Sequence, residues 1–122
     1  MASILIVDDE WTTRVELDEM LTSAGYQVAG KAETGRQAIE MAGELAPDLI
    51  LMDIAMPGEL DGISAAEIIK ADSNIPIIFL SGYGDPEFVE RAKRVEPFGY
   101  VMKPFDETEV KAFVEIALYK SN

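Results

Sequence analysis

Short runs of large apolar residues alternate along the chain with longer segments in which apolar residues recur every three or four positions. Such runs, when Gly, Pro or Asp bound them, are typical of buried strands, and the longer spacing is typical of amphipathic helices. The predicted strands are 4–7, 27–31, 49–53, 75–80 and 100–102. The predicted helices are 12–24, 34–46, a short helix after 61–62, 85–95, and a final helix from 106 that includes 110–118. The helix at 34–46 starts with a capping box, and the short helix after 61–62 is expected to bury Ala65, Ile68 and Ile69.

Strand and helix therefore alternate five times within 122 residues. This order predicts a three-layer α/β/α sandwich with a parallel sheet, because right-handed crossovers place helices on both faces. The strand at 27–31 has few apolar residues, which favours an edge position. The length suits one domain, and we expect residues 1–122 to form it.

The run at 49–52 ends abruptly in a carboxylate, Asp53. Burying an ionised side chain inside such a strand would cost several kcal/mol, roughly, so Asp53 is expected at the carboxyl end, where the strand surfaces. Open α/β sheets bind their ligands at that edge. The alternative interpretation is a helix N-cap, but residues 54–58 continue as a loop rather than a helix.

Four other polar residues also follow the ends of predicted strands. They are Asp8, Asp9, Ser81 and Lys103. Because parallel strands open onto the same edge of a sheet, these side chains are expected to converge with Asp53. Three carboxylates that lie close together raise one another's pKa, and a divalent cation relieves that repulsion. With Lys103 and one Mg²⁺ the formal charges of the site sum to zero.

The spacing of the acidic residues favours Mg²⁺ over Ca²⁺. A Ca²⁺ loop of the EF-hand kind is excluded, because Ala55 and Pro57 stand where it would need ligands. A metal ion, the Lys103 ammonium and the Ser81 hydroxyl beside the Asp53 carboxylate are the groups that phosphoryl transfer requires, with Asp53 as the nucleophile.

The composition narrows the chemistry further. The sequence contains no Cys and no His, which excludes disulfides, thiolate nucleophiles, His-dependent triads and imidazole metal sites. The sequence has no run of about 18 apolar residues and no signal peptide, so we expect no membrane span. Together with the absence of Cys, this indicates a cytoplasmic protein. The net charge of −13 argues against direct nucleic-acid binding. A basic cluster at 91–94 is either a solvated helix face or a docking site.

The whole chain resembles the receiver domains of two-component response regulators. The resemblance is carried by residues 7–10, 51–54, 56–58, 61–62, 80–82 and 100–105. It implies a doubly wound, flavodoxin-like sheet of order 2-1-3-4-5. The loop at 57–62 is one residue longer than the common form, and Gly82 stands where Ala is frequent.

The resemblance also implies roles for the acidic residues and for the loop after Asp53. Asp53 would be the phosphoacceptor, and Asp8, Asp9, Asp53 and the backbone carbonyl of Ala55 would hold Mg²⁺. The phosphoryl group would come from a histidine kinase or a phosphotransfer protein. The protein would then be a signalling switch in a phosphorelay rather than an enzyme. The reactions it would catalyse are only its own phosphorylation and dephosphorylation.

The same resemblance implies a switch. Lys103 would pair with phosphoryl oxygens, Ser81 would donate a hydrogen bond to one of them, and Tyr100 would turn inward when Ser81 moves. A cis peptide is expected before Pro104. The surface changed by phosphorylation would comprise 85–95, 100–102 and 107–120, and it would bind a partner protein or a second copy of the chain.

Three other functions fit parts of the pattern. A flavodoxin-like electron carrier needs a phosphate-cradling loop after its first strand, but here that loop starts with acidic residues. An aspartyl-nucleophile phosphatase needs a second acid where Ala55 stands. A docking module that is never phosphorylated would need none of Asp8, Asp9 or Asp53.

Overall fold

The structure is a computed structural model that describes residues 1–82 and 86–120. Its strands are β1 (Ser3–Val7), β2 (Gln27–Ala32), β3 (Leu49–Asp53), β4 (Ile77–Ser81) and β5 (Gly99–Met102). Its helices are α1 (Trp11–Ser23), α2 (Gly35–Leu45), α3 (Gly62–Asp72), α4 (Pro86–Val95) and α5 (Glu107–Lys120).

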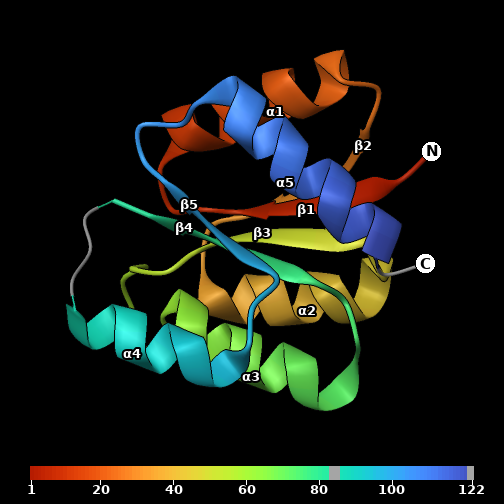
Figure 1. Ribbon diagram of the computed structural model, residues 1–122. Coiled ribbons are helices and arrows are strands. Elements are labelled where there is room, and N and C mark those ends of the chain that lie inside the picture. The colour runs from red at the N-terminus through yellow and green to blue at the C-terminus, as the bar shows by residue number, and fades with distance from the viewer. Residues whose placement is uncertain (83–85, 121–122) are drawn as a thin grey trace.

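All five strands are parallel and lie in the order β2-β1-β3-β4-β5. Helices α1 and α5 cover one face of the sheet, and α2, α3 and α4 cover the other (Figure 1). The predicted three-layer sandwich and its strand order are therefore confirmed. The central strands are buried on both faces, which explains why they are continuous apolar runs rather than alternating ones.

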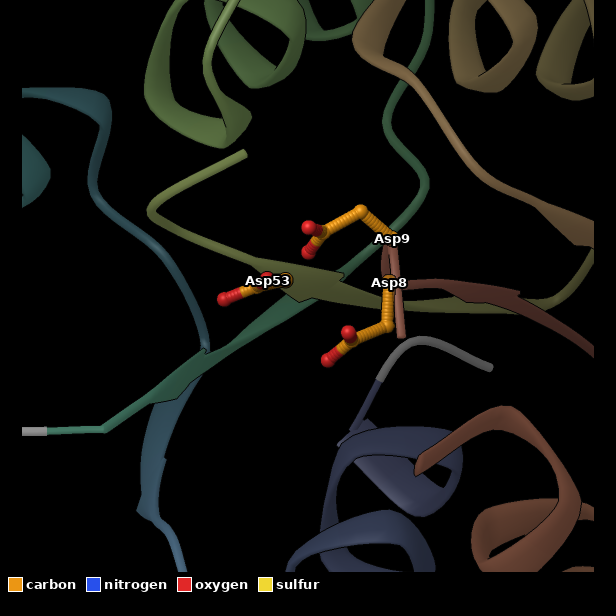
Figure 2. Close-up of side chains that lie close together, drawn as sticks. All are labelled: Asp8, Asp9 and Asp53. Atoms are coloured by element: carbon orange, nitrogen blue, oxygen red, sulfur yellow. The ribbon is translucent and has the colours of Figure 1, made fainter. Parts of the chain in front are cut away.

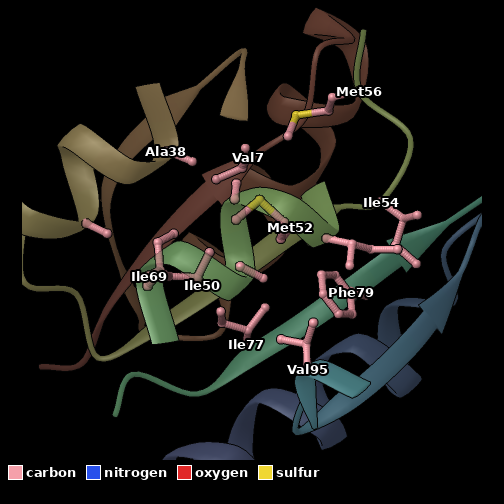
Figure 3. Packing of buried hydrophobic residues seen from close by; sticks show 14 of the residues in the cluster. Val7, Ala38, Ile50, Met52, Ile54, Met56, Ile69, Ile77, Phe79 and Val95 are labelled. Carbon is pink, nitrogen blue, oxygen red and sulfur yellow. The ribbon is translucent and has the colours of Figure 1, made fainter. Parts of the chain in front are cut away.

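Successive residues of each central strand enter two separate cores. In β3, for example, Ile50 and Met52 pack toward α2, α3 and α4, whereas Leu49 and Leu51 pack toward α1 and α5. Figure 3 shows the first of these cores, in which Phe79 is the largest fully buried side chain. Burying such a side chain stabilises the fold by roughly 1.5–3 kcal/mol, so packing in the two cores stabilises the strands whose ends carry the polar residues.

The ends of α2 follow the predicted signals with one difference. The hydroxyl of Thr34 accepts a hydrogen bond from the Gln37 N–H at 3.1 Å, as a helix N-cap does. The Gln37 side chain accepts from the N–H of Glu33, at 2.8 Å, instead of returning to the N–H of the cap itself. At the other end Ala46 has a φ of 44°, directly before Pro47, so the chain leaves the helix there.

Several element bounds differ from the predicted ones. Helix α4 is described from Pro86 onward, and Asp85, its predicted first residue, lies outside the described residues. Strand β4 begins two residues late, at Ile77. The prediction that Ile68 faces the core of α3 is wrong, because Ala65 and Ile69 occupy that face while Ile68 is 42% exposed. Within residues 1–82 and 86–120, no helix is both long and apolar enough to span a bilayer.

Candidate functional site

The predicted site residues meet at the carboxyl edge of the sheet. Asp8 follows β1 directly, Asp53 is the last residue of β3, Ser81 is the last residue of β4, and Lys103 follows β5. Strand pairing fixes this convergence, since Asp53 lies opposite Leu80, the neighbour of Ser81. The structure thus brings the residues that the sequence places at strand ends to one edge of the sheet.

Three carboxylates lie together at this edge. Asp8, Asp9 and Asp53 each offer an oxygen, and these oxygens lie within 4.8 Å of one another. Figure 2 shows the three side chains around one small space. Asp8 and Asp53 are buried, whereas Asp9 is exposed, so the cluster opens to solvent on one side. Such a set of hard oxygen donors in an open pocket fits Mg²⁺, which keeps some of its waters.

One ammonium lies among these carboxylates. The Lys103 Nζ is 2.8 Å from Asp8 Oδ2, 3.6 Å from Asp53 Oδ1 and 3.7 Å from Glu10 Oε1. One cation cannot neutralise this set, so negative charge remains in excess. The peptide between Lys103 and Pro104 is cis, as expected.

The excess charge changes the acidity of the central carboxyl group. Burial and the charge of Asp8 raise the pKa of Asp53 to about 7, against the opposing effects of Lys103 and the Ala55 N–H. The pKa of Lys103 is also raised, because hydrogen bonding to Asp8 and the charge of Asp53 outweigh the effect of burial. A divalent cation would replace the missing positive charge, and the residues present fit one.

The start of α3 packs directly against the end of β3. The Gly62 N–H donates to the carbonyl of Ile54 at 2.9 Å, and a Cβ on Gly62 would overlap the carbonyl oxygen of Asp53. Between these residues the loop exposes Ala55, whose N–H lies 3.4 Å from Asp53 Oδ1. Gly62 therefore permits the close approach of helix and strand that fixes the position of Asp53.

Ser81 and Tyr100 lie on neighbouring strands. Ser81 is buried, and its carbonyl accepts a hydrogen bond from the Lys103 N–H at 2.7 Å. Tyr100 lies opposite Phe79 in the sheet, and its half-buried ring packs against the core on the α4 side. Among the residues that the structure describes, the buried Tyr100 hydroxyl has no hydrogen-bond partner.

Arg14 of α1 is also part of this region, although it is not among the predicted site residues. It is 7% exposed, and its guanidinium donates to the carbonyl of Asp8 at 2.8 Å. One signal in the sequence could have found it. Arg14 precedes Leu17 and Leu21 on the buried face of α1, at positions where an apolar residue is usual.

A parallel sheet of this order, with three acidic side chains and a lysine at its carboxyl edge, defines the class. The sequence model of the response regulator receiver domain matches residues 4–115, and the chain belongs to this family. It is a receiver domain of two-component signalling.

Individual relatives agree with that class. The chain is 44% identical over 108 residues to the chemotaxis protein CheY of Thermotoga maritima, and this alignment covers 88% of this chain and 89% of that protein. It is 37% identical over 115 residues to the transcriptional regulatory protein PdtaR of Mycobacterium tuberculosis, covering 94% of this chain but 56% of PdtaR. The structure of the signal receiver domain of a modulated diguanylate cyclase from Desulfovibrio desulfuricans aligns with a TM-score of 0.93 at 39% identity, covering 98% of this chain and 95% of that one.

Proposed function

We propose that this chain takes a phosphoryl group onto Asp53 and thereby switches a protein-docking surface. One observation carries the proposal: three carboxylates have oxygens within 4.8 Å of one another, and Lys103 Nζ is 3.6 Å from Asp53 Oδ1. The sequence has no His, so the chain cannot carry a phosphohistidine itself, and the donor is another protein or domain or a small molecule. Membership of the receiver family favours a phosphohistidine of a histidine kinase or of a phosphotransfer protein. A carboxylate oxygen of Asp53 attacks phosphorus, the phosphorus–nitrogen bond breaks, and its electron pair returns to the donor imidazole.

Asp8, Asp9, Asp53 and the carbonyl of Ala55 would hold Mg²⁺. When bound, the ion supplies positive charge that screens the carboxylates from the phosphoryl oxygens. Lys103 contributes the second positive charge, since its hydrogen bond to Asp8 holds the ammonium beside the acceptor. Together these charges offset the roughly two negative charges that a phosphoryl group adds.

Ser81 and Tyr100 would convert this local change into a changed surface. Ser81 ends the strand next to Asp53, where its hydroxyl would donate a hydrogen bond to a phosphoryl oxygen. Tyr100 has no described partner for its buried hydroxyl, and an unpaired buried hydroxyl is unfavourable, so a second ring position that pairs the hydroxyl would be favoured. Two ring positions that differ by only a few kcal/mol, roughly, are what such a switch needs.

The docking surface would comprise α4, β5 and α5. Three large apolar side chains on β5 and α5 are exposed: Met102, Ile116 and Tyr119. They would meet a partner protein or a second copy of the chain, whereas the net charge of −13 disfavours nucleic acid. We place this function in the cytoplasm and assign it to residues 1–122 as one receiver domain.

The central test is the intact mass after incubation with a small phosphodonor such as acetyl phosphate, with and without Mg²⁺. We expect one added phosphoryl group that depends on Mg²⁺, none in Asp53→Asn, and a higher Mg²⁺ requirement in Asp9→Asn. Full and stable labelling of Asp53→Asn would contradict the assignment. If the wild type accepts no phosphoryl group from a small donor or from a supplied kinase, the chain is an unphosphorylated docking module instead.

The switch has its own test. Ser81→Ala should still accept phosphate on Asp53 but should show smaller chemical-shift changes over residues 88–102 than the phosphorylated wild type. Equal shift changes in the two proteins would disprove the coupling through Ser81. Sedimentation with and without a phosphoryl mimic would show whether the surface binds a second copy.

A further inference from the structure

Four polar side chains are buried in the part of the chain that the structure describes. They are Asp8, Asp53, Ser81 and Arg14. The first three belong to the proposed phosphoryl site, and Arg14 has no role there so far. Burying a guanidinium is unfavourable unless its donors are satisfied, so its contacts show what it does.

Arg14 joins two loops at the site edge of the sheet. Its Nη1 donates to the carbonyl oxygen of Asp8 at 2.8 Å, and its Nη2 donates to Glu33 Oε1 at 3.0 Å. The first acceptor lies in the loop between β1 and α1, and the second lies between β2 and α2. Glu33 is itself anchored, because its N–H donates to Gln37 at the start of α2.

We propose that Arg14 is a positioning residue for the metal site, an inference that rests on the proposed function. The carbonyl that it holds belongs to the peptide linking Asp8 to Asp9, and the orientation of that peptide sets the directions of both side chains. The Asp8 carboxylate is held separately by two donors of its own, the Glu10 N–H at 2.9 Å and the Lys103 ammonium. Asp9 is exposed, so the direction of its carboxylate depends more on the backbone.

Charge and position predict opposite effects when Arg14 is removed. By charge alone, losing a cation beside an acidic cluster makes the site more negative and tightens Mg²⁺ binding. Loss of positioning lets the Asp8–Asp9 peptide rotate and weakens binding. Residues that orient metal ligands typically change metal affinity by about 10- to 100-fold, so the positioning effect is expected to dominate.

The experiment measures the Mg²⁺ dissociation constant in two ways, neither of which needs phosphorylation. Trp11 is the only Trp in the sequence, is 68% exposed and lies two residues from Asp9, so its emission should report occupancy. The rise of the urea midpoint with Mg²⁺ gives the same constant independently. We expect Arg14→Met to bind Mg²⁺ about tenfold more weakly. Arg14→Lys, which can reach one of the two acceptors, should lie between it and the wild type.

Lys70 provides a matched control. Its Nζ donates to the carbonyls of Val95 and Glu96, at 2.8 and 2.7 Å, so it too is a cation that binds backbone carbonyls, but at the far end of α4. Lys70→Met should lose stability and keep the wild-type affinity for Mg²⁺. This variant separates a general loss of stability from a loss of positioning.

The outcomes distinguish the two proposals. If the wild type neither binds Mg²⁺ nor accepts a phosphoryl group on Asp53, the proposed function fails, and the role of Arg14 fails with it. If the wild type does both and Arg14→Met binds Mg²⁺ as tightly or more tightly, only the positioning role is overturned. An equal loss of affinity in Arg14→Met and Lys70→Met would also overturn it.

Discussion

Replacing Asp53 by Asn should stabilise the metal-free protein, and the gain should depend on pH. In the folded state Asp53 is buried beside Asp8, and these two effects raise its pKa to about 7 from the ordinary value of 3.8. In the unfolded chain the carboxyl group is solvated and ionises at the ordinary value. Folding therefore penalises the ionised form of Asp53.

The sign and size of the effect follow from this difference. A raised pKa contributes stability that is fully present below about pH 4 and is lost as pH rises through about 7. At about 1.4 kcal/mol per pH unit the full difference would amount to about 4 kcal/mol. Because Asp9 is exposed and water reaches the cluster on that side, we expect about half, near 2 kcal/mol.

Urea unfolding followed by circular dichroism, with a chelator present, measures the effect at about pH 4.5 and about pH 8. Asp53→Asn should exceed the wild type by about 2 kcal/mol at the higher pH and by much less at the lower pH. The control is Glu40→Gln, which removes one negative charge at an exposed position of α2 and should show no such trend. At ten times its dissociation constant, Mg²⁺ should return about 1.4 kcal/mol to the wild type and less to the Asn variant.

Two results would refute this reasoning. A stability difference that is the same at both pH values would mean that Asp53 is not destabilised by burial and by its charged neighbour. An Asn variant that is less stable than the wild type at the higher pH would mean that Lys103 more than compensates the carboxylate.

Three further predictions concern one glycine in α3, one glycine in α2 and the Asp61 side chain that caps α3. Gly62→Ala should lower the free energy of unfolding by about 3 kcal/mol, because its Cβ would displace the end of β3. Gly43→Ala, where a Cβ meets nothing within 4 Å, should raise it by about 0.5–1 kcal/mol in the same urea assay. Asp61→Asn should cost about 0.5–1 kcal/mol at neutral pH, because it breaks the ion pair with Arg91 at 2.8 Å. Although burial opposes it, the pKa of Asp61 is lowered by its hydrogen bonds to the Ser64 N–H and to Arg91, so this cost should disappear as the pH falls through that lowered pKa.

The fold was predictable because the apolar residues of its central strands are consecutive and do not follow the spacing of an amphipathic helix. Four consecutive large apolar residues before Asp53, or before Asp8, satisfy no amphipathic helix, and the breakers around them fix their length. The site was predictable for a related reason. A carboxylate at the end of such a run lies at the carboxyl end of its strand, and in a parallel sheet all such ends share one edge. The expectation that Asp53 reaches solvent there was wrong, because Asp53 is buried and the cluster opens to solvent at Asp9.

Contacts between elements distant in sequence were not predictable in this way. Ile68 and Ile69 fit the spacing of α3 about equally well, and only packing against the sheet decides that Ile69 is buried. The bond from Lys70 to the carbonyl of Val95 joins α3 to the end of α4 and leaves no local trace in the sequence. Both contacts depend on how the helices lie on the sheet, which the period of one helix does not specify.

The buried charges connect stability to function in this domain. Asp8 and Asp53 destabilise each other in the folded state, and a receiver that replaced them by apolar residues would be expected to fold more tightly. Such a chain could hold neither a divalent cation nor a phosphoryl group at this edge. The residues that break the apolar pattern are thus the ones that the fold tolerates at a cost in stability. Arg14 fits this pattern as well, because a buried guanidinium that holds the backbone of Asp8 stabilises the geometry of a site that its own charges destabilise.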